Sequence, residues 1–160
     1  MTTSVTIARS IPLNRNALLP LLRAQLATLE EASEHGTVVL GARIFGNGRI
    51  AVPVRLHIGY PHPKTPRFGV TITARATPAL YPRFRGELVL TEAGTAATIV
   101  TLAGEYEVPL GVLGSAFDRI AGHGVAPRGL EDLLERLAAD VLAEAGRHAD
   151  AAYRAGRRSN

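Results

Sequence analysis

Apolar and polar side chains alternate through most of residues 37–108, and this period of two is typical of β-strands with one buried face. Short connections rich in glycine, proline or charge separate the alternating segments, so we expect an antiparallel meander. Residues 4–9 alternate in the same way and predict a further strand near the start of the chain. The predicted strands of the meander are residues 37–45, 49–60, 67–77, 81–92 and 96–108.

Two segments outside the meander predict helices. Asn14 is a suitable N-cap for a helix that ends near Glu34. Pro20 lies inside this segment, and we expect two short helices or one kinked helix, because proline removes a backbone hydrogen bond and clashes with the preceding turn. After Pro127 apolar side chains recur every three or four residues, which predicts a long C-terminal helix with one apolar stripe. The stripe consists of Leu130, Leu133, Leu134, Leu137, Val141 and Ala145.

The lengths of the last helix and of the strands match. A helix of about 22 residues rises ~33 Å, and a strand of ten to twelve residues spans ~33–40 Å. The apolar stripe of the helix and the apolar face of the sheet should therefore cover each other. Gly122, Gly124 and Pro127 predict breaks before this helix, and residues 154–160 are predicted to be a disordered basic tail. We therefore expect a single domain over residues 1–153.

The composition is that of an ordinary globular protein, with 160 residues of which 46% are hydrophobic and 20% charged. The chain has no cysteine, which excludes disulfides and thiolate chemistry. No signal peptide is evident at the N-terminus, and no window approaches about 18 consecutive apolar residues. We therefore expect a cytoplasmic protein without a transmembrane segment. Lys64 is the one lysine among 18 basic residues, and we interpret this bias as the mark of a GC-rich bacterial genome.

The net charge of +4 is concentrated in the meander. Residues 37–108 hold eight arginines or lysines against four glutamates, and the alternation places most of these arginines on the outer face. We interpret this face as solvated, with Glu105 and Glu107 paired to arginines across strands. It lacks aromatic side chains for stacking bases, so we expect no nucleic-acid partner. Transient contact with an anionic membrane is the alternative role.

Residues with catalytic chemistry are sparse. The five histidines lack metal-ligand spacing, and the chain shows no Ser/His/Asp set, no paired inward carboxylates and no phosphate loop. We expect no metal, no cofactor and no catalytic residue. Tyr60 and Tyr106 fall on inward faces, where each hydroxyl either orients a ligand or bonds to the backbone. Gly86 either leaves room for a ligand or marks a bend of the sheet, and we favour the bend.

The junction GEYEVPLGVLGSAFDRI, residues 104–120, joins the last strand to the helical region. Its Pro109, Gly111 and Gly114 interrupt an apolar run, and Ser115 with Asp118 has the capping-box pattern of a short helix. Residues 84–120 thus show two strands around a polar glycine hairpin, an aromatic-proline exit and a glycine-rich lead into a helix. In this pattern and in the order of its elements the chain resembles the START-like (SRPBCC) superfamily. That superfamily includes START-type lipid-binding domains, polyketide cyclase/dehydrase-like proteins and the major birch pollen allergen family.

The resemblance implies an α+β helix-grip fold. A curved antiparallel sheet of six or seven strands would wrap around a long C-terminal helix, with two short helices after strand one. The resemblance also implies an apolar cavity between sheet and helix, lined by Val54, Leu56, Ile58, Tyr60, Val70, Ile72, Phe84, Leu88, Leu102, Tyr106, Leu113, Phe117, Leu134, Leu137 and Val141. The junction would form the lip of this cavity, with an apolar gate of Leu110, Val112, Leu113 and Phe117. Alternatively, the junction residues plug the end of a filled core.

Three functions are compatible with these features. The first is binding or transport of a hydrophobic small molecule or lipid in the cavity, by a monomer or dimer. The second is a polyketide cyclase- or aromatase-like enzyme, which needs two polar groups that converge on one bound atom, and the sequence shows no such pair. The third is an interaction protein with a filled core, which binds a partner through the basic sheet face or the C-terminal helix. We place binding first.

Overall fold

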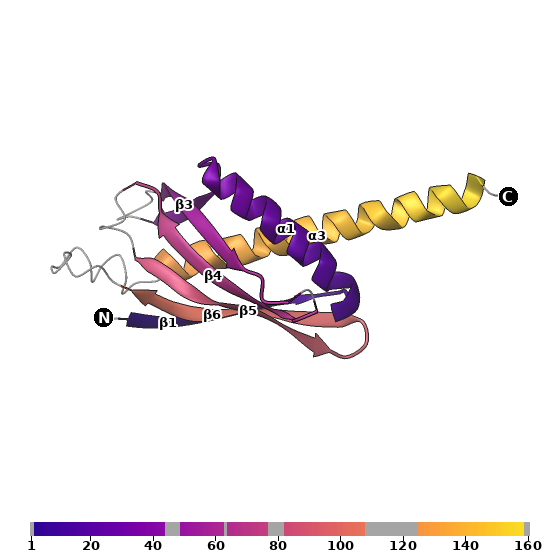
Figure 1. Cartoon of the computed structure of the whole chain (residues 1–160), viewed down its shortest axis with the longest axis horizontal. Helices are drawn as coiled ribbons and strands as arrows, with labels where there is room; N and C mark the ends of the chain where they lie inside the picture. Colours follow the sequence, from indigo (N-terminus) through magenta and orange to yellow (C-terminus); the bar gives the residue numbers. More distant parts are fainter. Residues whose placement is uncertain (1, 44–48, 63, 77–81, 108–124, 159–160) are drawn as a thin grey trace.

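The computed structural model describes residues 2–43, 49–62, 64–76, 82–107 and 125–158. Within these residues the chain forms six strands and two helices (Figure 1). Their bounds are β1 Thr2–Ile11, α1 Arg15–Glu34, β2 Val39–Arg43, β3 Arg49–Gly59, β4 Arg67–Ala74, β5 Arg83–Ala93, β6 Ala97–Glu107 and α3 Val125–Arg158. The predicted α+β order of elements is confirmed, and strand ends differ from the predicted ones by a few residues.

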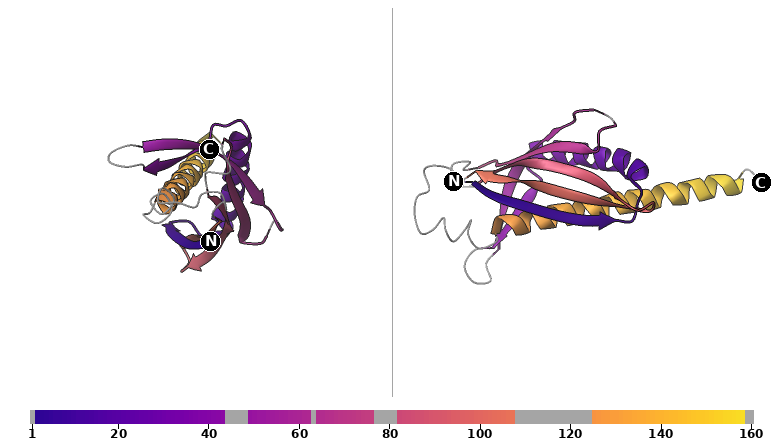
Figure 2. Two further views of the ribbon diagram at one scale, coloured as in Figure 1. Left: turned by 90° about the vertical axis from the view of Figure 1, so that its left-hand side faces the viewer. Right: turned by 90° about the horizontal axis from the view of Figure 1, so that it is seen from below.

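The six strands form one antiparallel sheet in the order β1-β6-β5-β4-β3-β2. Strands β2 to β6 follow one another along the chain, which confirms the meander. Strand β1 lies beside β6, with its register running from Thr2 opposite Glu107 to Ile11 opposite Thr98. Seen from the end, the sheet curls around α3 as a half-open barrel (Figure 2).

Helix α1 is one continuous helix of 20 residues that contains Pro20, so the prediction of two short helices is wrong. Asn14 caps it as predicted and accepts a hydrogen bond from the backbone N–H of Ala17 at 2.9 Å. The helix buries three leucines against the sheet, namely Leu18, Leu22 and Leu26. Burial of three leucines is worth about 5–9 kcal/mol and offsets the roughly 3 kcal/mol that an internal proline costs.

Helix α3 is longer than predicted, with 34 residues that rise about 51 Å. Pro127 does not break it, because it lies in the first turn, where a missing N–H is tolerated. Residues 154–158 belong to the helix, so the predicted disordered tail is wrong there. Alanine-rich sequence favours helix, and Arg157 and Arg158 in the last turn suit the helix dipole. The predicted breaks at residues 122 and 124 lie outside the described residues.

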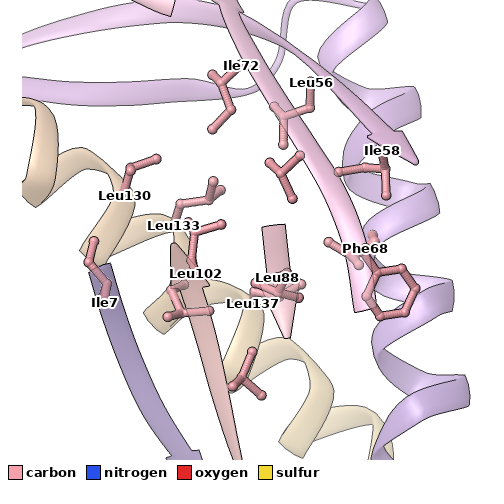
Figure 3. Packing of buried hydrophobic residues seen from close by; sticks show 14 of the residues in the cluster. Ile7, Leu56, Ile58, Phe68, Ile72, Leu88, Leu102, Leu130, Leu133 and Leu137 are labelled. Carbon is pink, nitrogen blue, oxygen red and sulfur yellow. The ribbon is translucent and has the colours of Figure 1, made fainter. Parts of the chain in front are cut away.

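The hydrophobic core lies between the concave face of the sheet, α1 and α3. The predicted stripe of α3 is buried from Leu130 to Val141, and Figure 3 shows Leu133 and Leu137 close to Leu102 and Leu88. Strand residues alternate as expected, and the buried positions of β4, for example, are Phe68, Val70, Ile72 and Ala74. The predicted pairing of apolar stripe and apolar sheet face is therefore confirmed.

The outer face of the sheet carries the arginines, and several have acidic neighbours. Arg55 lies 3.3 Å from Glu34, and Arg67 lies 3.1 Å from Glu87. The β5–β6 register places two further arginine–glutamate pairs directly opposite each other, namely Arg83 with Glu107 and Arg85 with Glu105. The predicted cross-strand neighbours are thus in place, and their charges offset one another on this face.

Candidate functional site

A small apolar cavity of about 20 Å³ lies between α1, α3 and the concave face of the sheet. Its volume has room for about one water-sized molecule. Among the described residues, only leucine, isoleucine and valine side chains line it: Leu26, Leu29, Leu56, Ile58, Val70, Leu88, Leu102, Leu133, Leu134 and Leu137. The cavity therefore offers dispersion contacts and no polar partner.

The cavity residues proposed from the sequence fall into three groups. Seven line the cavity, namely Leu56, Ile58, Val70, Leu88, Leu102, Leu134 and Leu137. Five are buried in the same core without lining this cavity, namely Val54, Ile72, Phe84, Tyr106 and Val141. Tyr60 is half-buried at the margin of the core, and Leu113 and Phe117, with the proposed lip and gate, lie outside the described residues. A ligand-binding role for this set stays a prediction.

The contribution of α1 to the cavity wall was not predicted from the sequence. Leu26 and Leu29 come from α1, and Leu133 belongs to the stripe of α3 without having been assigned to the cavity. The spacing of Leu22, Leu26 and Leu29 is a helical apolar stripe of the same kind as that of α3. That signal was present in the sequence, but it did not reveal where α1 lies relative to the sheet.

A groove of about 160 Å³ lies outside the cavity, between α1 and α3. Its lining comes equally from the two helices: Gln25, Thr28, Leu29 and Ala32 of α1, and Leu133, Arg136, Leu137 and Asp140 of α3. Three of these residues, Leu29, Leu133 and Leu137, also line the internal cavity. Groove and cavity therefore share a wall made of leucine side chains.

The rim of this groove is polar and carries both signs of charge. Arg136 donates through Nη2 to the carbonyl oxygen of Val39 at 3.2 Å and through Nε to that of Asp132 at 3.4 Å. Asp140 follows one turn later on α3 and is exposed. On α1, Thr28 donates its hydroxyl hydrogen to the carbonyl oxygen of Ala24 at 3.1 Å, so its oxygen is left to accept hydrogen bonds.

Tyr60 is the unusual polar group of the core margin. Its hydroxyl oxygen is buried and has no hydrogen-bond partner among the described residues, so the backbone bond considered from the sequence is absent there. Its ring meets Phe68 edge to face at 6.0 Å, and the Arg23 guanidinium lies 5.4 Å from the centroid of each ring. Burial, with a contribution from the Glu30 carboxylate, raises the pKa of Tyr60, and the charge of Arg23 opposes that rise.

Tyr106 lies in a different aromatic pair, and its ring centroid is 5.3 Å from that of Phe84. The same Phe84 ring explains Gly86. A Cβ on Gly86 would lie 2.3 Å from the Ala103 carbonyl oxygen and 2.7 Å from Phe84 Cζ. The glycine thus permits a close approach of backbone and ring and leaves no space for a ligand at this position, while the predicted bend stays a prediction.

Comparisons with known proteins agree with this geometry. No protein-family model matches the sequence, and no curated protein matches it. Among solved structures, norcoclaurine synthase from Thalictrum flavum, in complex with dopamine and hydroxybenzaldehyde, has a TM-score of 0.57 at 12% identity, covering 89% of this chain and 87% of that chain. TTHA0849 from Thermus thermophilus has a TM-score of 0.56 at 18% identity, covering 89% of this chain and 99% of that one. Ara h 8.0201 has a TM-score of 0.57 at 11% identity, with coverage of 89% and 99%.

The chain shares the helix-grip fold of these solved proteins. In this fold the cavity described above lies between the sheet and both helices, and the larger ligand cavity that the resemblance implies stays a prediction. In the described part of the chain, no cluster of three or more histidine, aspartate or glutamate side chains is placed to hold a metal ion. Neither helix, as far as the structure describes it, is long and apolar enough to cross a membrane.

Proposed function

We propose that the protein binds a hydrophobic small molecule or lipid in the interior between the sheet and α3. The observation that carries this proposal is the cavity wall, to which two helices and four strands contribute only leucine, isoleucine and valine side chains. Norcoclaurine synthase, which has the same fold, has been solved in complex with dopamine and hydroxybenzaldehyde, which supports small-molecule binding by this architecture.

Binding requires the cavity to enlarge. Pockets for drug-sized ligands have volumes of about 300–1,000 Å³, whereas the described cavity measures about 20 Å³. Leucine, isoleucine and valine side chains form the described wall, so they can be displaced without leaving a buried polar group unpaired. We therefore expect ligand uptake to be slower than a diffusion-limited encounter, because the wall must move first.

Native mass spectrometry of the freshly purified protein is the direct test. An adduct of a few hundred daltons that is released by organic extraction would support the proposal and define the chemical class of the ligand. A titration with N-phenyl-1-naphthylamine, an uncharged fluorophore that brightens in apolar surroundings, tests the capacity of the cavity when no ligand is retained. Bare protein that also fails to bind this fluorophore would overturn the proposal.

Two tryptophan variants of α3 locate the binding site. Leu134 is buried in the cavity wall, whereas Leu142 on the same helix is 38% exposed. We expect Leu134→Trp to fill the cavity and weaken fluorophore binding at least tenfold, and Leu142→Trp to bind like the parent protein. Circular dichroism checks that both variants are folded. Equal affinity in the two folded variants would place the ligand elsewhere.

A further inference from the structure

We propose that the groove between α1 and α3 is the entrance to the internal cavity, and that its rim holds the polar head of the bound molecule. The ligand is then an amphiphile with an apolar body and an uncharged hydrogen-bonding head. This inference rests on the proposed function, because it concerns the route by which a ligand enters that cavity and the class of ligand that binds there.

The shared wall is the first argument. Leu29, Leu133 and Leu137 line the groove on one side and the cavity on the other. Leu133 and Leu137 lie one turn apart on α3 and are each 6% exposed, and Leu29 from α1 is half-buried. A change of staggered rotamer moves the end of a leucine side chain while the backbone stays in place. Rotamer changes in this wall would join the two spaces.

The alternative route through the sheet is costlier. Continuous antiparallel pairing joins β3 to β4, β4 to β5 and β5 to β6, so an opening there must break backbone hydrogen bonds. At the groove, the side chains of two helices form the lining. Separating side chains exposes some apolar surface and leaves each helix with its own backbone bonds. The helix–helix groove is therefore the easier place to open.

The rim chemistry determines the head group. Arg136 and Asp140 lie one helical turn apart, so a carboxylate attracted by one is repelled by the other, and the same holds for an amine. Part of the donor capacity of Arg136 is already used by backbone carbonyls of Val39 and Asp132. Gln25 and Thr28 on the facing helix offer uncharged donors and acceptors. A hydroxyl or amide head, which both donates and accepts, suits this rim.

Site-directed labelling tests the entrance, because the chain has no cysteine of its own. Thr28→Cys places a thiol on the groove rim, and Thr91→Cys places one on an exposed position of β5 as the matched control. Each variant is coupled to a polyethylene glycol maleimide, and uptake of N-phenyl-1-naphthylamine is followed by stopped-flow fluorescence. We expect the label at residue 28 to slow uptake at least tenfold and the label at residue 91 to leave the rate unchanged. Equal rates of fluorophore uptake in the two labelled proteins would contradict the proposed entrance. They would not contradict the proposed function.

A second measurement tests the head group. Displacement of the fluorophore by 1-decanol and by decanoate is compared in the parent protein and in Asp140→Asn. Removing a nearby like charge should strengthen decanoate binding about fivefold, which corresponds to roughly 1 kcal/mol for charges a few ångströms apart in water. Decanol binding should not change. If Asp140→Asn leaves the affinity for decanoate unchanged, the head does not lie at this rim and the ligand class proposed here is wrong. A parent protein that takes up no probe overturns the proposed function itself.

Discussion

The two halves of α3 have the same secondary structure and opposite relations to the rest of the molecule. From Leu130 to Val141 the leucine and valine side chains are buried against the sheet and α1. From Leu142 to Arg158 every side chain is exposed or half-buried, and this half extends beyond the sheet in both side views (Figures 1 and 2). The body of the fold therefore packs against only the first half of α3.

The two halves also owe their helical structure to different forces. Tertiary burial of a leucine stripe stabilises the first half, as it does most helices in proteins. The second half has local support from alanines, from the ion pair of Glu144 with Arg147, and from the contact of the Glu144 carboxylate with His148 Nε2 at 3.0 Å. Matched substitutions in the body and in the projecting half should therefore have different effects.

Leucine truncation should give the largest difference. Leu130 is fully buried, and Leu130→Ala should lower the free energy of unfolding by about 2–5 kcal/mol, because it removes contacts and leaves a cavity. Leu142→Ala should change it by less than about 0.5 kcal/mol. Urea denaturation of both variants measures the difference. Similar losses in both would mean that the projecting half is packed against something in solution.

Replacing glycine by alanine should lower the stability in the body of the fold and raise it in the projecting half of α3. A Cβ on Gly86 would lie within 2.3 Å of the Ala103 carbonyl oxygen, so Gly86→Ala should destabilise the protein by about 1–3 kcal/mol through overpacking. On the projecting half, a Cβ on Gly146 would meet no atom of the described residues within 4 Å, and Gly146→Ala should add up to about 1 kcal/mol of helix stability. Thermal unfolding followed by circular dichroism compares the two. A stabilised Gly86→Ala variant would contradict the close backbone approach.

The Tyr60 hydroxyl should make the stability of the protein sensitive to alkaline pH. Burial raises the pKa of Tyr60 above its ordinary value of 10.0, so the folded state holds this proton more tightly than the unfolded state. The stabilisation that this protonated hydroxyl contributes is fully present below the pKa of the unfolded state. It is lost as the pH rises through the pKa of the folded state. Tyr60→Phe should therefore lose less stability than the parent protein between about pH 9 and pH 11. It should change stability little at neutral pH, because the hydroxyl has no hydrogen-bond partner in the described part of the chain.

Tyr153→Phe, at a position that is 66% exposed on the projecting half, is the matched control variant. Denaturation curves across this pH range give both slopes. An unchanged slope in Tyr60→Phe would show that the Tyr60 hydroxyl titrates as a solvated one.

Truncation should have the smallest effect. A chain that ends after Ala145 lacks the projecting turns and keeps all of the buried stripe through Val141. We expect less helical circular dichroism signal and a free energy of unfolding within about 0.5 kcal/mol of the parent protein. A much less stable truncated protein would show that the projecting half contributes to the fold.

The sequence predicted the elements well where the pattern was local. Alternation gave the strands and their buried faces, the spacing of leucines gave the stripe of α3, and Asn14 gave the start of α1. Predictions failed where a local signal was outweighed. Pro20 did not divide α1, because the helix buries leucines on either side of it. The basic end of α3 remained helical although it contains Gly156 and three arginines, because it continues a helix that is already formed and each further residue adds a backbone hydrogen bond.

For the candidate site, the sequence by itself determined which side chains are apolar and which strand face they share, since a period of two leaves no other choice. Only the tertiary structure decided which of those faces enclose the cavity, because curvature of the sheet and the position of α1 depend on contacts between distant segments. Residues 25–32 and 133–140 are about a hundred positions apart in the chain, and no periodicity relates them. The groove that we propose as the entrance exists because α1 and α3 pack over the same sheet.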